Sequence, residues 1–135
     1  MEKIKIEYLG DLQTRITHQR SNTQLVTDAP VDNHGQGRSF SPTDLLCAAT
    51  GSCMLTIMGL AAQTGGFSIE GCRLTVTKEM ASEPRRVGAM HIDLDFRACH
   101  LDAKQRLIVE RSAKACPVMQ SLNQEMKKEL NFIYE

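Results

Sequence analysis

The chain has 135 residues, and its sixteen basic and sixteen acidic side chains cancel, so the formal net charge is zero. A chain of this length fits one domain with a modest core, and we expect a single domain over residues 1–135. With no basic surface, no tryptophan and few other aromatic residues, the composition argues against nucleic acid or an anionic membrane surface as a partner.

The first 39 residues predict a small antiparallel meander followed by a loop. Polar and apolar residues alternate in the first segment, and turn signals at Gly10-Asp11 and Ser21-Asn22 separate the candidate strands. Because the first six residues alternate like a strand, they do not resemble a signal peptide, and we expect a cytoplasmic protein with reduced cysteines. The expected strands are 3–9, 12–18 and 23–27, and the expected loop is 28–39.

A long uncharged helix follows this loop. Ser41 suits the N-cap, Pro42 suits the first helical position, and Asp44 suits the third, where a carboxylate meets free N–H groups. No charged residue occurs from Leu45 to Ala62, and glycines end the run at 65–66. Apolar and small residues surround the helix, so we expect it to be buried on all sides in a soluble protein rather than to cross a membrane.

The second half of the chain predicts two strands, two helices and a last strand. The two strands should form a hairpin, and the second of them alternates most clearly between apolar and polar side chains. Asp102 suits the N-cap of the first helix, and Cys116 suits that of the second, because Pro117 favours the first helical position. The expected ranges are 67–78, 87–98, 103–115, 117–129 and 130–134. The resulting order βββαββααβ indicates an α+β fold.

Five cysteines and four histidines are the candidates for chemistry. They form no CxxC pair and show no zinc-binding spacing, so we expect no metal and no cofactor. A thiol reacts as the thiolate, whose pKa falls near a helix N-terminus or a cation. Cys116 has the first feature, whereas Cys53, in the middle of the central helix, requires a cation. The candidate cations are Arg15, Arg20 and Arg38. Taken alone, the residues leave both cysteines open to a reactive or a packing role. The cysteines expected to be packing residues are Cys47, Cys72 and Cys99.

Two segments carry a family resemblance. The run Ser-Pro-x-Asp-Leu-Leu-x-Ala-Ala-x-Gly-Ser-Cys, which ends at Cys53, resembles the first cysteine motif of the OsmC/Ohr family, the osmotically inducible and organic hydroperoxide resistance proteins. Cys-Pro-Val at 116–118 resembles the second. The resemblance spans nearly the whole chain and is nearer to the OsmC-like branch. It implies antiparallel sheets around a long buried central helix, an intertwined homodimer, and active sites at the subunit interface.

The resemblance also implies a cysteine-based peroxidase. Cys53 would attack a hydroperoxide and become a sulfenic acid, Cys116 would resolve it as a disulfide, and a dithiol would reduce that disulfide. Arg15 is the best match to the family's activating arginine, with Arg20 and Arg38 as alternatives. The apolar wall around Cys53 favours organic over hydrogen peroxide as the substrate; it consists of Leu55, Ile57 and Met58.

One departure from the family pattern affects the site. The hydroperoxide resistance branch has a glutamate directly after the motif's proline, where this chain has Thr43. Asp44 follows it, but it lies nine residues before Cys53, about 13 Å along a helix and on the opposite side. We therefore expect Asp44 to cap the helix. Two other functions remain open, namely a non-catalytic dimeric module that binds a small hydrophobic ligand and a redox sensor that signals through a disulfide.

Overall fold

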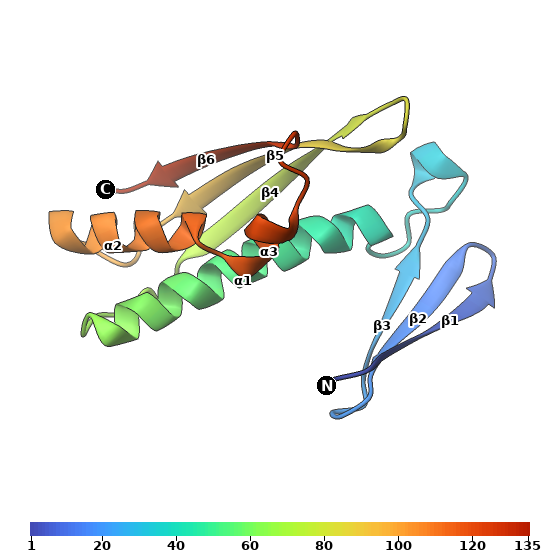
Figure 1. Cartoon of the computed structure of the whole chain (residues 1–135), viewed down its shortest axis with the longest axis horizontal. Helices are drawn as coiled ribbons and strands as arrows, with labels where there is room; N and C mark the ends of the chain where they lie inside the picture. Colours follow the sequence, from blue (N-terminus) through green and yellow to red (C-terminus); the bar gives the residue numbers. More distant parts are fainter. The chain divides into compact units, whose positions relative to one another are not determined.

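The computed structural model describes residues 1–135, which form two compact units, Met1–Leu46 and Cys47–Glu135 (Figure 1). The chain is α+β, and its elements follow the predicted order βββαββααβ. The strands are β1 Ile4–Gly10, β2 Gln13–His18, β3 Thr23–Asp28, β4 Arg73–Ala81, β5 Arg86–Asp95 and β6 Lys127–Ile133. The helices are α1 Pro42–Thr64, α2 Ala103–Lys114 and α3 Pro117–Ser121, with a short 3-10 turn at Val31–Asn33. The single domain expected over residues 1–135 stays a prediction.

The N-terminal unit contains the predicted meander. Strands β1, β2 and β3 pair in sequence order and antiparallel, with Glu7 opposite Arg15. The loop after β3 is held by Arg38, whose side chain donates to the buried carboxylate of Asp28 through Nε at 2.7 Å and to Asp11 through Nη2 at 3.2 Å. This ion pair raises the pKa of Arg38 and lowers that of Asp28. The loop therefore has a fixed path between β3 and α1.

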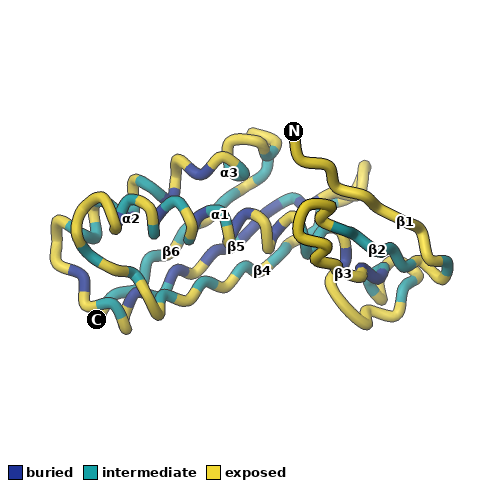
Figure 2. Tube along the Cα trace, turned by 90° about the horizontal axis from the view of Figure 1, so that it is seen from below, coloured by how far each residue is buried: buried dark blue, intermediate teal, exposed yellow.

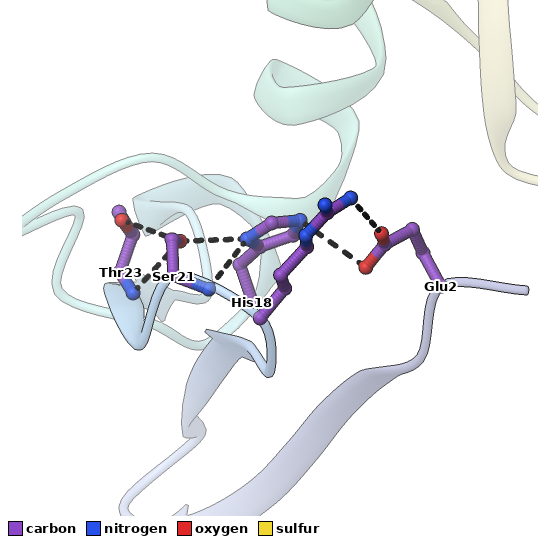
Figure 3. Close-up of polar contacts among 5 residues, drawn as sticks. Glu2, His18, Ser21 and Thr23 are labelled. Carbon is purple, nitrogen blue, oxygen red and sulfur yellow. Dashed lines mark hydrogen bonds and ion pairs between the residues drawn. The ribbon is translucent and has the colours of Figure 1, made fainter.

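Polar side chains connect the start of the chain to the turn between β2 and β3 (Figure 3). His18 Nδ1 lies 2.6 Å from Ser21 Oγ, which donates to Thr23 Oγ1 at 2.9 Å. The carboxylate of Glu2 lies 3.8 Å from His18 Nε2 and accepts from Arg20 at 3.1 Å. All of these groups are exposed, so their contribution to stability is small. We interpret the cluster as hydrogen bonds and ion pairs that stabilise a local turn.

Helix α1 begins as predicted. The Ser41 hydroxyl accepts from the backbone N–H of Asp44, and the Asp44 carboxylate accepts from the backbone N–H of Ser41, both at 3.0 Å. This reciprocal pair is a capping box with aspartate at the third position. Asp44 is therefore the capping acid that the sequence predicts.

The prediction that α1 is buried on all sides is wrong for the single chain. A stripe with Met54, Met58 and Ala62 is fully buried, whereas Leu60 on another side is 60% exposed. The elements of the C-terminal unit lie along one side of α1 (Figure 1). By length and composition α1 could also cross a membrane. Its most apolar 18-residue stretch has a mean hydropathy of 1.8, and 33% of that stretch is buried within the chain.

The sheet of the C-terminal unit has the order β4-β5-β6. Strands β4 and β5 form the expected antiparallel hairpin, and β6 pairs with β5 in parallel. The inward-facing side chains of β5 and its continuation are fully buried, as the alternation predicts, and β5 is drawn largely in dark blue in Figure 2. They are Met90, Ile92, Leu94 and Phe96.

Several element boundaries differ from the prediction by up to three residues, including the start of β6 at Lys127 rather than at residue 130, and two differ by more. Strand β4 begins at Arg73 rather than at residue 67, because residues 69–72 form a turn in which Gly71 has a φ of +91°. Helix α3 ends at Ser121 rather than at residue 129. Directly after it, the Asn123 side chain accepts from the backbone N–H of Glu125 at 2.9 Å, and this local turn competes with further helix.

Candidate dithiol site

The two cysteines of the resemblance lie together in the C-terminal unit. Cys53 is in the middle of α1 and half-buried, and Cys116 is the N-cap of α3 and fully buried. The two thiols are near enough to interact, because the Cys53 side chain is one of the groups that raise the pKa of Cys116. The backbone N–H of Met119 donates to Cys116 Sγ at 3.4 Å, and Cys116 Sγ contacts the carbonyl oxygen of Thr50 at 3.9 Å. The predicted cap geometry of Cys116 is confirmed, and it brings α3 against the centre of α1.

The surroundings of Cys116 favour its neutral thiol. Burial is the main cause that raises its pKa, and the neighbouring Cys53 thiol raises it further, while the Met119 N–H lowers it in part. A buried thiol with a raised pKa is a poor attacking nucleophile. It can still condense with a sulfenic acid on a neighbouring sulfur. The geometry therefore suits Cys116 to the second of the two redox steps.

All three candidate arginines belong to the N-terminal unit, and each forms an ion pair there. Arg15 contacts Glu7 at 2.9 Å on the adjacent strand, and Arg20 contacts Glu2 at 3.1 Å. Arg38 is held by the buried Asp28. The carboxylate that holds Arg38 is buried, whereas Glu7, which contacts Arg15, is exposed. Arg15 therefore remains the predicted activator of Cys53.

The other three cysteines have environments of a different kind. Cys47 is buried in the core of the chain. Burial raises the pKa of Cys72 to about 12, with further contributions from Cys99 and Asp95, and burial also raises the pKa of Cys99. Cys99 Sγ contacts the carbonyl oxygen of Ile69 at 3.5 Å. These surroundings disfavour thiolates and agree with packing roles, which stay a prediction.

An apolar groove is lined by residues that lie close in sequence to both cysteines. It has a volume of about 480 Å³ and runs between α1 and α2. Ile57, one turn after Cys53, lines it from α1, and Ala115, next to Cys116, lines it from the end of α2. The other lining residues are Leu60, Ala61, Thr64, Gly65, Ile108 and Ser112. The sequence singled out Ile57 but not the α2 side of the groove. The four-residue spacing of Ile108 and Ser112, which places both on one face of α2, could have indicated the α2 side of the groove.

Comparisons with known proteins identify the family. The model of the OsmC-like protein family matches residues 35–131. A crystal structure from Psychrobacter arcticus 273-4, provisionally described as an osmotic stress induced and detoxification response protein, is 43% identical, with a TM-score of 0.90 over 100% of this chain and 96% of that chain.

Two more distant structures share the fold. An OsmC-like protein from Mycoplasma pneumoniae is 15% identical, with a TM-score of 0.82 over 99% of this chain and 96% of that one. An organic hydroperoxide resistance protein OsmC from Legionella pneumophila is 16% identical, with a TM-score of 0.75 over 98% and 96%. No curated protein matches the sequence. The family match covers most of the chain and includes both cysteines, and we conclude that the protein belongs to the OsmC-like family.

Proposed function

We propose that the protein is a thiol-dependent peroxidase that reduces organic hydroperoxides through a Cys53–Cys116 disulfide cycle. The observation that carries this proposal is the proximity of the two thiols, one half-buried on α1 and one fully buried at the cap of α3, which shows in the effect of Cys53 on the pKa of Cys116. Proteins described as organic hydroperoxide resistance proteins share the fold. A redox role in peroxide resistance agrees with family membership.

The proposed cycle has three balanced steps. The Cys53 thiolate attacks the terminal oxygen of the hydroperoxide, the O–O bond breaks, and the alkoxide takes a proton and leaves as an alcohol. The Cys116 sulfur then attacks the sulfenic acid on Cys53, which forms the disulfide and releases water. Two thiol groups of a dithiol return both cysteines to thiols and become a disulfide themselves. No cofactor takes part.

The cation in the first step is proposed to be Arg15. A thiolate on Cys53 requires a nearby positive charge, since the middle of a helix gains little from the helix dipole. If this assignment is right, Arg15→Ala should raise the pH at which Cys53 is alkylated and should slow its oxidation. An unchanged pH profile in that variant would point instead to Arg38 or Arg20.

The groove between α1 and α2 supports an organic substrate. Its walls are mostly aliphatic, and they include Ile57, one turn after Cys53, and Ala115, the residue before Cys116. An alkyl or aryl group buried there gains about 25 cal/mol per Å² of apolar surface removed from water, whereas hydrogen peroxide gains nothing. We therefore expect cumene hydroperoxide to oxidise Cys53 faster than hydrogen peroxide does.

The same groove favours one alternative, a non-catalytic module that binds a small hydrophobic ligand. Peroxide consumption separates the two functions. With a dithiol as reductant, the peroxidase should consume hydroperoxide over many turnovers, whereas a binding module should not. A redox sensor would be oxidised once, without turnover, and its binding to a partner protein would then change. Loss of consumption in Cys53→Ser, but not in Cys47→Ser, would support the proposed function.

A further inference from the structure

Cys72 and Cys99 are a second pair of neighbouring thiols in the C-terminal unit, and the proposed peroxidase cycle does not use them. Cys72 lies in the turn before β4, and Cys99 lies in the turn after β5. The carbonyl oxygen of Ile69 accepts from the backbone N–H of Cys72 at 2.9 Å and lies 3.5 Å from Cys99 Sγ. One carbonyl oxygen therefore contacts both the backbone of Cys72 and the sulfur of Cys99.

The residues directly before the two cysteines also meet. A Cβ atom placed on Gly71 would lie 3.6 Å from the Cβ atom of Ala98, which is ordinary van der Waals contact. The proximity of the two sulfurs agrees with this contact, because the charge of the Cys99 thiolate is one of the causes that raise the pKa of Cys72. Both thiols are free and only half-buried. They are therefore close neighbours that a small oxidant can reach.

Burial affects the two oxidation states of this pair differently. It raises the pKa of both thiols, because a thiolate loses its hydration, and Asp95 raises both pKa values further. A disulfide carries no charge, so burial imposes no such cost on it. The pair should therefore be slow to oxidise, since few thiolates are present. Once formed, the disulfide should also be slow to be reduced, since a thiol with a high pKa is a poor leaving group.

The position of the pair connects it with the support of the candidate peroxide site. The segment from Cys72 to Cys99 contains the whole β4–β5 hairpin. Strand β4 packs closely against α1, because a Cβ atom placed on Gly51 would lie 2.7 Å from Leu74 Cδ2. Gly51 precedes Cys53 by two residues, and Leu74 follows Cys72 by two. A bond at Cys72 would therefore fix the start of the strand on which the Cys53 segment of α1 packs.

We infer that Cys72 and Cys99 are a second disulfide site, which excess hydroperoxide oxidises and whose disulfide joins the two ends of the β4–β5 hairpin. The Cys99 thiolate attacks the terminal oxygen of the hydroperoxide, the O–O bond breaks, and the alkoxide takes a proton and leaves as an alcohol. Cys72 Sγ then attacks the sulfenic acid on Cys99 and loses its proton, and the hydroxyl group leaves as water. The two thiols lose two electrons, and one hydroperoxide gains them.

The site can be tested without the Cys53–Cys116 pair. The Cys53→Ser, Cys116→Ser double variant retains only Cys47, Cys72 and Cys99. It is treated with a large excess of cumene hydroperoxide, its remaining thiols are blocked, and the disulfides of the monomeric chain are mapped by mass spectrometry without reduction. We expect a Cys72–Cys99 disulfide and a blocked Cys47. Recovery of Cys72 and Cys99 as blocked thiols or as separate sulfinic acids would overturn the inference.

The parent protein gives a second measurement, which does not depend on the folding of the double variant. In a time course with excess cumene hydroperoxide, the Cys53–Cys116 disulfide should form first. The Cys72–Cys99 disulfide should follow roughly tenfold or more slowly, because so little of either thiol is ionised. Formation of both disulfides at the same rate would contradict the protected environment assigned to Cys72 and Cys99.

The effect on the hairpin has its own measurement and a matched control. Oxidation should raise the melting temperature of the double variant by roughly 5 °C, since a disulfide restricts the unfolded chain. Cys72→Ser added to the double variant removes the bond, and the same treatment should then produce no rise. Differential scanning calorimetry measures both proteins. If the disulfide is present by mass spectrometry but the melting temperature is unchanged, the bond does not stabilise the hairpin.

The outcomes for this site and for the proposed function are separate. If the Cys72–Cys99 disulfide forms in the double variant but the parent forms no Cys53–Cys116 disulfide, the peroxidase proposal fails and the second site stands. If the parent forms only the Cys53–Cys116 disulfide in excess hydroperoxide, the second site is wrong and the peroxidase proposal stands.

Discussion

At the scale of single residues, the contrast between Cys53 and Cys116 is the main result. Their thiols are near enough to interact, yet they differ in exposure, and burial raises the pKa of Cys116. A residue that attacks peroxide needs access and a thiolate, whereas a residue that traps a sulfenic acid needs only proximity. The structure therefore gives a physical reason for assigning the two steps in this order.

This assignment predicts different results for two serine variants. Cys53→Ser should lose peroxide reduction entirely, because a hydroxyl is too weak an acid to replace a thiolate. Cys116→Ser should still undergo the first oxidation and leave a sulfenic acid that dimedone labels, which excess peroxide then carries on to sulfinic acid. Stopped-flow oxidation with dimedone trapping measures both. Oxidation retained in Cys53→Ser and lost in Cys116→Ser would reverse the roles.

Cys72 gives a second prediction at this scale. Its pKa of about 12 lies about four units above pH 8, so only a very small fraction is thiolate in the folded protein. We expect iodoacetamide at pH 8 to modify Cys72 slowly in the native state, and to modify it readily after unfolding in guanidinium. Mass spectrometry of tryptic peptides measures both rates. Equal rates in the folded and unfolded protein would show that Cys72 is not held in this environment.

At the scale of elements, the starts of the helices were predictable because they depend on local chemistry. Asp102 caps α2 as the sequence indicates, with its side chain accepting from the backbone N–H of Gln105 at 2.8 Å. Asp102→Ala should lower the free energy of unfolding by about 1 kcal/mol. Denaturant titration measures this, with Lys104→Ala on the same helix as the control. Equal stability of Asp102→Ala and the control would show that the cap contributes little.

The ends of elements and the sides of α1 were less predictable. Helix α3 stops at Ser121, because the next residues form their own turn around Asn123. Helix α1 carries no charged residue after Asp44, but the sequence could not show that the chain's own sheet covers only one side of it. For the same reason the residues of the site were identifiable only through the family motifs. The meeting of Cys53 with Cys116 depends on the packing of α3 on α1.

The outer face of the sheet makes the stability depend on pH. His91 on β5 lies between Glu79 on β4, at 2.9 Å, and Glu129 on β6, at 2.6 Å, and Lys127 also contacts Glu129. The two glutamates raise the pKa of His91, the Glu79 hydrogen bond most, and the pKa of Glu129 is lowered, mainly by Lys127. His91 therefore stabilises the fold below its unfolded pKa of about 6.5. This stabilisation disappears as the pH rises through the higher folded value.

We expect the melting temperature to fall as the pH increases from 6 to 9, and to fall less in His91→Gln. The effect should be small, because His91 is partly exposed and water screens its ion pairs. Differential scanning calorimetry in 0.1 M salt measures it, with His34→Gln in the loop as the control. A wild-type profile retained in His91→Gln would assign the pH dependence to another group.

At the scale of the whole molecule, exposed apolar surface indicates that one chain is not the final assembly. Leu60 on α1 is 60% exposed, and Ile4, Ile6 and Tyr8 on β1 are each about two-thirds exposed. The alternate positions of the three β1 residues place them on one face of the strand, and exposed apolar surface of this kind marks an interaction site. We therefore propose that the protein is a homodimer, as the resemblance implies.

Sedimentation equilibrium at micromolar concentration tests this assembly. We expect a mass near twice 15.0 kDa, and we expect Leu60→Glu to weaken association because it places a charge in the apolar surface. Lys104→Glu is the control for an added negative charge elsewhere. A folded monomer at these concentrations would contradict the homodimer.

The central claim is that Cys53 and Cys116 form one redox pair. Its most direct test is to treat the reduced protein with one equivalent of cumene hydroperoxide, block the remaining thiols, digest without reduction and map the disulfides by mass spectrometry. The account predicts a Cys53–Cys116 disulfide, with Cys47, Cys72 and Cys99 recovered as blocked thiols. A disulfide between other cysteines, or five blocked thiols with the peroxide unspent, would contradict it.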